Sequence, residues 1–280
     1  MWILSIRKTE SLTGPFHAMV GPLRDFVSLT PHHTTAMKYR GFIIDQGLSP
    51  IDGKFYVAIM TLKSLNAKTG NMAQVFIIRG DIHPLEAIAS GEDFTICGSC
   101  PHRRRYDDSL GKYVRSCYVD VGKSVGAVYR AYLNGSYVDL TQDPPQDAVQ
   151  WLHKHLAVRR IRWGAYGDPA IIKPGTVLAF NSMAEGHTGY THQWRQEFAS
   201  PFTGIFMASC DSFQDYLDAS EAGWRTFAVV PQGQQAYSGK LCPATVEGSQ
   251  AQCITCKLCD GAKTDIHVEA HGLGAKFVAA

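Results

Sequence analysis

The chain has 280 residues, of which 45% are hydrophobic and 19% charged, and this composition excludes an intrinsically disordered protein. The 27 Lys and Arg residues nearly balance the 25 Asp and Glu residues, so the net charge of +2 gives no bulk attraction to nucleic acid or to a membrane surface. The chain has no apolar run long enough to span a membrane and no secretory signal pattern at its start, so we expect a cytoplasmic protein without a membrane partner.

Residues 1–93 are expected to form the N-terminal α+β part of the main domain. The runs GFIIDQG, KFYVAIMTL and AQVFIIRG are rich in β-branched and aromatic residues and are separated by turn residues, so they predict three strands of one sheet. The run HPLEAIASG predicts a short helix that Gly91 closes. Residues 94–145 hold three cysteines, a basic run and several Gly and Tyr residues, and they predict a cysteine-bearing insertion.

Residues 146–280 are expected to form a βα-repeat part that ends in a metal-binding segment. The run QDAVQWLHKHLAVR predicts an amphipathic helix, and KPGTVLAFNSMAEG and SFQDYLDASEAG predict two more, the last with Ser212 as its N-cap. Strands are predicted at RIRWGAY, HTGYTHQW, GIFMASC, WRTFAVV and DIHVEA. Because strands and helices alternate, we predict an α/β fold with a barrel-like or partial βα barrel, and a doubly wound sheet is the alternative.

Four cysteines near the C-terminus have the spacing C-x10-C-x2-C-x2-C; they are Cys242, Cys253, Cys256 and Cys259. Zinc sites usually combine two C-x2-C pairs with a longer gap between them. Three cysteines separated by two residues, with a remote fourth one, are more typical of a [4Fe–4S] cluster, and Pro243 follows the remote cysteine as is common there. We therefore predict a [4Fe–4S] cluster, with zinc as the alternative.

A second group of cysteines lies in the centre of the chain and consists of Cys97, Cys100 and Cys117. Its spacing, C-x2-C-x16-C, provides three sulfur ligands, and the fourth ligand is His102, Cys210 or absent. A cluster with one open iron and a zinc site with three cysteines and one histidine are both compatible with this pattern.

Polar side chains recur where the predicted strands end, which is where α/β folds place their active sites. Asp168, Tyr190, His192 and Asp211 are the candidate catalytic residues on this rim. Taken singly, Asp168 before Pro169 is also typical of a turn, Asp211 of a helix start, and His192 of a hydrogen-bonded core histidine.

A basic run directly follows the central C-x2-C pair and consists of Arg103, Arg104 and Arg105. These residues are candidates for a contact with phosphate groups of a nucleotide or nucleic acid, although a solvated basic turn is the commoner case. The motifs of P-loop NTPases, G-x-S-x-G hydrolases and H-E-x-x-H proteases are absent from the sequence.

Several phrases taken together resemble the phage- and plasmid-encoded gene-product-88-like family, whose domain has no known function; they are KTGNMAQ, CGSCPHR, SCYV, YGDPA, GYTHQW, MASCDS, GWRTF and CITCKLCDG. They extend over about residues 64–272. The resemblance implies a mobile-element protein in the cytoplasm of a bacterial host, and it implies no activity. It also implies that position 210 need not be a cysteine, so Cys210 is the least favoured ligand.

The sequence thus predicts a metal-binding protein, and two functions fit it. The first is an iron–sulfur enzyme with its active site at the strand ends and a substrate such as a nucleotide or nucleic acid. The second is a zinc-stabilised, non-enzymatic protein that binds host nucleic acid or a host protein.

Overall fold

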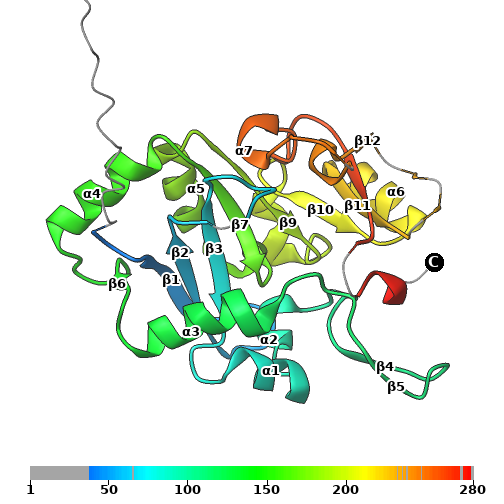
Figure 1. Cartoon of the computed structure of the whole chain (residues 1–280), viewed down its shortest axis with the longest axis horizontal. Coiled ribbons are helices and arrows are strands. Elements are labelled where there is room, and N and C mark those ends of the chain that lie inside the picture. Colours follow the sequence, from blue (N-terminus) through cyan, green and yellow to red (C-terminus); the bar gives the residue numbers. More distant parts are fainter. Residues whose placement is uncertain are drawn as a thin grey trace, which may run out of the picture. The chain divides into compact units, whose positions relative to one another are not determined.

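The structure is a computed structural model that describes residues 38–280 except 65, 232, 235, 238, 247, 272, 273, 279 and 280. Residues 1–37 of the predicted N-terminal part therefore lie outside the described residues. The described residues form a mixed α/β fold with a six-stranded sheet, a five-stranded sheet and a separate hairpin (Figure 1). None of the helices in these ranges is long and apolar enough to cross a membrane.

The six-stranded sheet has the order β6-β1-β2-β3-β7-β8. The strands β1, β2 and β3 pair antiparallel, whereas β7 and β8 continue from β3 in parallel and β6 is parallel to β1. The three strands predicted near the N-terminus are confirmed as β1, β2 and β3. The strands are β1 (Phe42–Leu48), β2 (Phe55–Thr61), β3 (Ala73–Ile78), β6 (Val138–Asp139), β7 (Arg160–Tyr166) and β8 (Gly186–Thr188).

The five-stranded sheet is parallel throughout and has the order β12-β13-β11-β10-β9. The single strand predicted at HTGYTHQW is in fact split between the two sheets at Gly189, where an added Cβ would stand 2.4 Å from the ring of Phe206. The described residues show no closed barrel. The strands are β9 (Tyr190–Thr191), β10 (Met207–Cys210), β11 (Thr226–Val230), β12 (Lys240–Leu241) and β13 (Ile266–Glu269).

The helices follow the local signals of the sequence. Gly91 closes α1 in a left-handed conformation with a φ of 83°, and the hydroxyl of Ser212 caps α6 by accepting from the amide of Asp215. Ala148, Leu152 and Leu156 form the buried face of α4. The helices are α1 (Pro84–Ser90), α2 (Phe94–Cys97), α3 (Gly126–Leu133), α4 (Gln146–Leu156), α5 (Pro174–Met183), α6 (Phe213–Glu221) and α7 (Cys253–Cys256).

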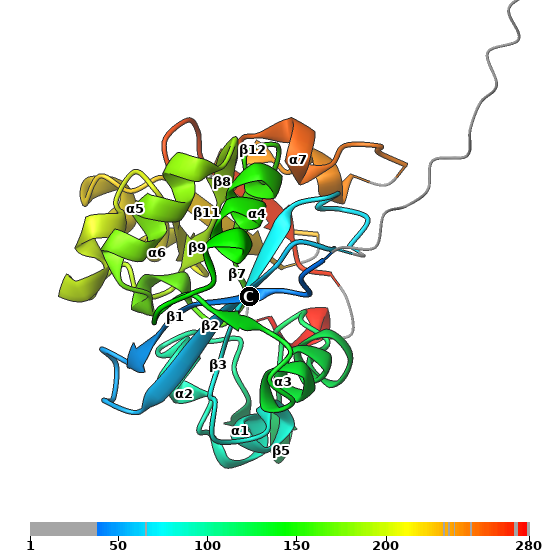
Figure 2. The ribbon, with the colours of Figure 1, turned by 90° about the vertical axis from the view of Figure 1, so that its left-hand side faces the viewer.

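Residues 94–145 pack against the main sheet. Ile96 of α2 and Val128 of α3 belong to the same hydrophobic core as the strands, and β6 extends the sheet. In Figure 2, α1, α2 and α3 lie together near one end of β2 and β3, while α4 lies near the opposite end. The hairpin of β4 (Arg105–Asp107) and β5 (Lys112–Val114) projects from this segment (Figure 1).

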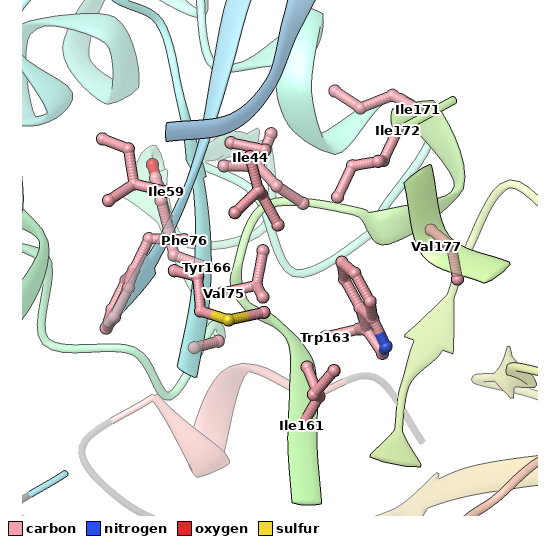
Figure 3. Close-up of a cluster of buried hydrophobic side chains, with 14 of the residues drawn as sticks. Ile44, Ile59, Val75, Phe76, Ile161, Trp163, Tyr166, Ile171, Ile172 and Val177 are labelled. Carbon is pink, nitrogen blue, oxygen red and sulfur yellow. The ribbon is translucent and has the colours of Figure 1, made fainter. Parts of the chain in front are cut away.

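The core lies between the central strands and the helices that follow β7 (Figure 3). Trp163 of β7 is fully buried there, and its indole N–H donates to Asn181 Oδ1 at 2.9 Å. Burial of each large apolar side chain contributes roughly 1.5–3 kcal/mol. This packing positions β7, whose end precedes Asp168.

Candidate functional site

The four C-terminal cysteines meet in one place, as their spacing predicts. Cys242, Cys253, Cys256 and Cys259 line one small pocket together with Thr188, Ala244, Lys257 and Leu258. Helix α7 carries two of these cysteines, and β12 ends just before Cys242 (Figure 1). We call this set the C-terminal cysteine group.

The segment that carries this group is anchored to the loop before β3. The amide of Cys253 donates to Lys68 O at 2.9 Å, and the side chain of Gln252 donates to Ala67 O at the same distance. An added Cβ on Gly70 would stand 2.8 Å from Ile254, and the φ of Gly70 is +67°, so a glycine is needed at this contact. Residues 67–70, which are distant in the sequence, therefore hold the segment that carries the cysteines.

A buried arginine lies beside the C-terminal cysteine group. Arg160 is only 2% exposed, and its guanidinium donates to the carbonyl oxygens of Cys253 and His187 at 2.8 Å each. Its Nε is buried without a hydrogen-bond partner. Burial lowers the pKa of Arg160, and the nearest opposing influences are the carboxylate of Asp260 and the thiols of the group.

Tyr190, the fourth residue predicted on the catalytic rim, packs against Cys259 of the C-terminal cysteine group. Burial raises the pKa of the Cys259 thiol to about 12, and a hydrogen bond with the Tyr190 side chain acts in the opposite direction. The Tyr190 ring packs against Phe227 with 4.1 Å between the ring centroids. A metal ion that binds this thiol would displace its proton.

The sulfur atoms of this group are not gathered as closely as zinc ligands. Among the described residues, the only set of three His, Cys, Asp or Glu ligand atoms within 4.8 Å of one another is His102, His192 and Asp211. Four thiolates on one zinc ion at about 2.3 Å would lie about 3.8 Å apart. In a cubane each thiolate binds a separate iron, which needs wider spacing.

The three central cysteines also converge. The amide of Cys100 donates to Cys97 O at 3.2 Å, which forms the turn of the C-x2-C pair, and the amide of Cys117 donates to His102 O at 3.0 Å. Burial raises the pKa of Cys97 and of Cys117, and their thiols and that of Cys100 influence one another. We call Cys97, Cys100 and Cys117 the central cysteine group.

Gly98 and Gln193 fix the position of the C-x2-C turn. Gly98 has a φ of 52°, and an added Cβ there would stand 2.4 Å from Gln193 Oε1. The Gln193 side chain donates to Cys97 O at 3.1 Å. The nearest ring nitrogen to this group is His192 Nε2, at 3.9 Å from Cys100 Sγ. Cys210, one of the candidate fourth ligands of this group, is bonded away from it, because its thiol donates to Ala208 O.

The structure brings three of the four predicted catalytic residues together. Asp168 is buried after β7, and its carboxylate accepts from the amides of Ala170 and His192 at 3.0 and 2.8 Å. His192 follows β9, and its Nε2 lies 3.1 Å from Asp211 Oδ2 at the end of β10. Asp168 thus positions the backbone of His192, and burial raises the pKa of this carboxyl.

His102 completes this group opposite His192, a position that the sequence analysis did not predict. Its Nε2 lies 2.8 Å from Asp211 Oδ1, and its Nδ1 lies 2.8 Å from Ser116 Oγ. Burial alone would raise the pKa of Asp211, but the two imidazoles outweigh it and lower this pKa well below the usual range. No periodic pattern in the sequence connects residue 102 with residue 211.

The three arginines of the basic run are occupied by contacts within the chain. Arg103 forms two bonds to Asp93 Oδ1 and donates to two carbonyl oxygens. Arg104 stacks on Tyr113 with 3.5 Å between its Cζ and the ring centroid, and Arg105 donates to Phe277 O at 3.3 Å. These contacts favour a structural role for the run over a free phosphate-binding surface.

Comparisons of the chain with family models, with curated proteins and with solved structures find no match.

Proposed function

We propose that the protein is an iron–sulfur enzyme. Cys242, Cys253, Cys256 and Cys259 would bind a [4Fe–4S] cluster, and the rim formed by Asp168, His192 and Asp211 would be the active site. The observation that carries the proposal is the convergence of the four thiols in one pocket beside the buried Arg160.

The charge of Arg160 supports an anionic occupant. A buried, uncompensated charge costs several kcal/mol, and the guanidinium has only carbonyl oxygens as hydrogen-bond partners. Four thiolates around a cluster provide net negative charge beside the guanidinium. The bound cluster would supply one-electron transfer.

The two candidate centres are close in the chain. Tyr190, which contacts Cys259, is separated from His192 by one residue, so their Cα atoms are at most about 7 Å apart. A cluster at the C-terminal cysteine group would therefore lie near the rim. Such proximity suits the exchange of electrons between the cluster and a substrate at the rim.

The central cysteine group is proposed as a second metal site, for which a cluster with an open iron and zinc stay alternatives. A nucleotide or nucleic acid stays the proposed substrate class, and Arg103, Arg104 and Arg105 are not part of this proposal because of their internal contacts. Three further statements are proposals as well: the chain comes from a phage or plasmid, it acts in the cytoplasm of a bacterial host, and its parallel strands form a barrel-like or partial βα arrangement.

Anaerobic purification tests the proposal against the zinc-stabilised binding protein. We expect brown protein with iron and acid-labile sulfide, and Cys256→Ser should lose this iron and sulfide. Cys210→Ser is the matched control, because Cys210 is buried outside both groups and its thiol donates only to Ala208 O. Colourless protein with stoichiometric zinc and no sulfide would support the alternative.

A further inference from the structure

Three ligand atoms of different residues converge at the rim. His102 Nε2, His192 Nε2 and the Asp211 carboxylate lie within 4.8 Å of one another and are supplied by three separate segments of the chain. We call these residues the His–Asp group. None of them belongs to either cysteine group.

The hydrogen bonding of this group is incomplete. His102 Nε2 and Asp211 Oδ1 are buried and 2.8 Å apart, yet their directions do not form a hydrogen bond, and neither atom has another partner. If His102 Nδ1 donates to Ser116 Oγ, its Nε2 carries a lone pair that faces a carboxylate oxygen. Two acceptors in contact are unfavourable unless a proton or a metal cation lies between them.

The distances fit a shared metal ion. Two ligands at about 2.1 Å from one ion and at right angles to each other lie about 3 Å apart. The distance from His102 Nε2 to Asp211 Oδ1 is 2.8 Å, and the distance from His192 Nε2 to Asp211 Oδ2 is 3.1 Å. Metal-bound histidines usually donate their second N–H to a nearby oxygen, which is the arrangement of His102 and Ser116.

We propose that His102, His192 and Asp211 bind one divalent first-row transition metal ion. Two imidazoles and one carboxylate are the ligand set of octahedral sites that leave positions open for water or substrate. This inference goes beyond the iron–sulfur proposal and does not rest on it, because the C-terminal cysteines contribute no ligand.

The central cysteine group competes with the His–Asp group for His192 as a ligand. Its Nε2 lies 3.1 Å from Asp211 and 3.9 Å from Cys100 Sγ, so it could instead complete the central cysteine group. A metal probe that prefers nitrogen and oxygen ligands distinguishes the two sites. Mn²⁺ has this preference, whereas thiolate sites select softer ions.

The test is a titration of the full chain with Mn²⁺ alone, after dialysis against a chelator, in which the signal of free Mn²⁺ is followed by electron paramagnetic resonance. We expect one bound ion per chain, and at least tenfold weaker binding in Asp211→Asn and His102→Gln. The matched controls Asp143→Asn and His153→Gln, both at exposed positions, should bind like the unmodified protein. Circular dichroism of each variant shows whether it is folded.

Two results would overturn the proposal. The first is that the unmodified protein binds no more Mn²⁺ than folded Asp211→Asn or His102→Gln. The second is that Cys100→Ser loses Mn²⁺ as completely as Asp211→Asn, which would assign His192 to the central cysteine group. Cys256→Ser separates this question from the iron–sulfur proposal, because it should lose the cluster and keep the Mn²⁺ site.

Discussion

The contact between Gly98 and Gln193 holds the C-x2-C turn of the central cysteine group, and a substitution at Gly98 tests it. In Gly98→Ala the new Cβ would stand 2.4 Å from Gln193 Oε1, in a backbone conformation with a φ of +52°. The conformation costs about 1–3 kcal/mol, and displacing the Gln193 amide from Cys97 O costs about 1–3 kcal/mol more. We expect the free energy of unfolding to fall by the sum, roughly 2–6 kcal/mol.

Gly91→Ala is the matched control for this prediction. Gly91 has a φ of 83° and a ψ of 3°, in the ordinary left-handed region, and nothing within 4 Å of an added Cβ, so this variant has a backbone cost alone; this cost is smaller than at Gly98, where ψ is −128°. Thermal and urea unfolding of both variants measure the difference, which should place the melting temperature of Gly98→Ala roughly 2–12 °C below that of Gly91→Ala. Equal stability of the two variants, with unchanged metal content, would refute the docking of the C-x2-C turn on Gln193.

The remaining predictions concern the C-terminal cysteine group. Tyr190→Phe should keep the cluster but lower its reduction potential by roughly 60 mV in redox titration, since a hydrogen bond to a charged sulfur contributes about 1.5 kcal/mol; an unchanged potential would contradict the contact with Cys259. Arg160→Met should reduce the iron content of the anaerobically purified protein, because it removes a buried positive charge beside the cluster; an unchanged iron content would contradict this. Removal of the cluster should speed hydrogen exchange at the Cys253 amide, which is bonded to Lys68 O, and unchanged exchange would show that the metal does not hold this segment.

Local sequence patterns predict most of the elements of this fold. The alternating apolar runs give β1, β2 and β3, and the spacing of Ala148, Leu152 and Leu156 gives the buried face of α4. The split at Gly189 was not predictable, because it depends on the ring of Phe206, which reaches this position only in the folded chain.

The candidate sites were predictable in part. The rule that active-site residues follow parallel strands brings Asp168, His192 and Asp211 together, and the cysteine spacing identifies both cysteine groups. The same rule predicts Tyr190 on this rim, and its side chain packs against Cys259. The sequence indicates His102 only as a ligand of the cysteines. Its contact with Asp211 cannot be predicted, because a loop residue without periodicity carries no pattern that points to a distant partner.

The content of iron and acid-labile sulfide in anaerobically purified protein distinguishes a cluster from zinc. We expect Cys256→Ser to contain about four fewer sulfides per chain than Cys210→Ser, together with the loss of the corresponding iron. Equal sulfide in the two variants, or zinc without sulfide in the unmodified protein, would contradict this expectation.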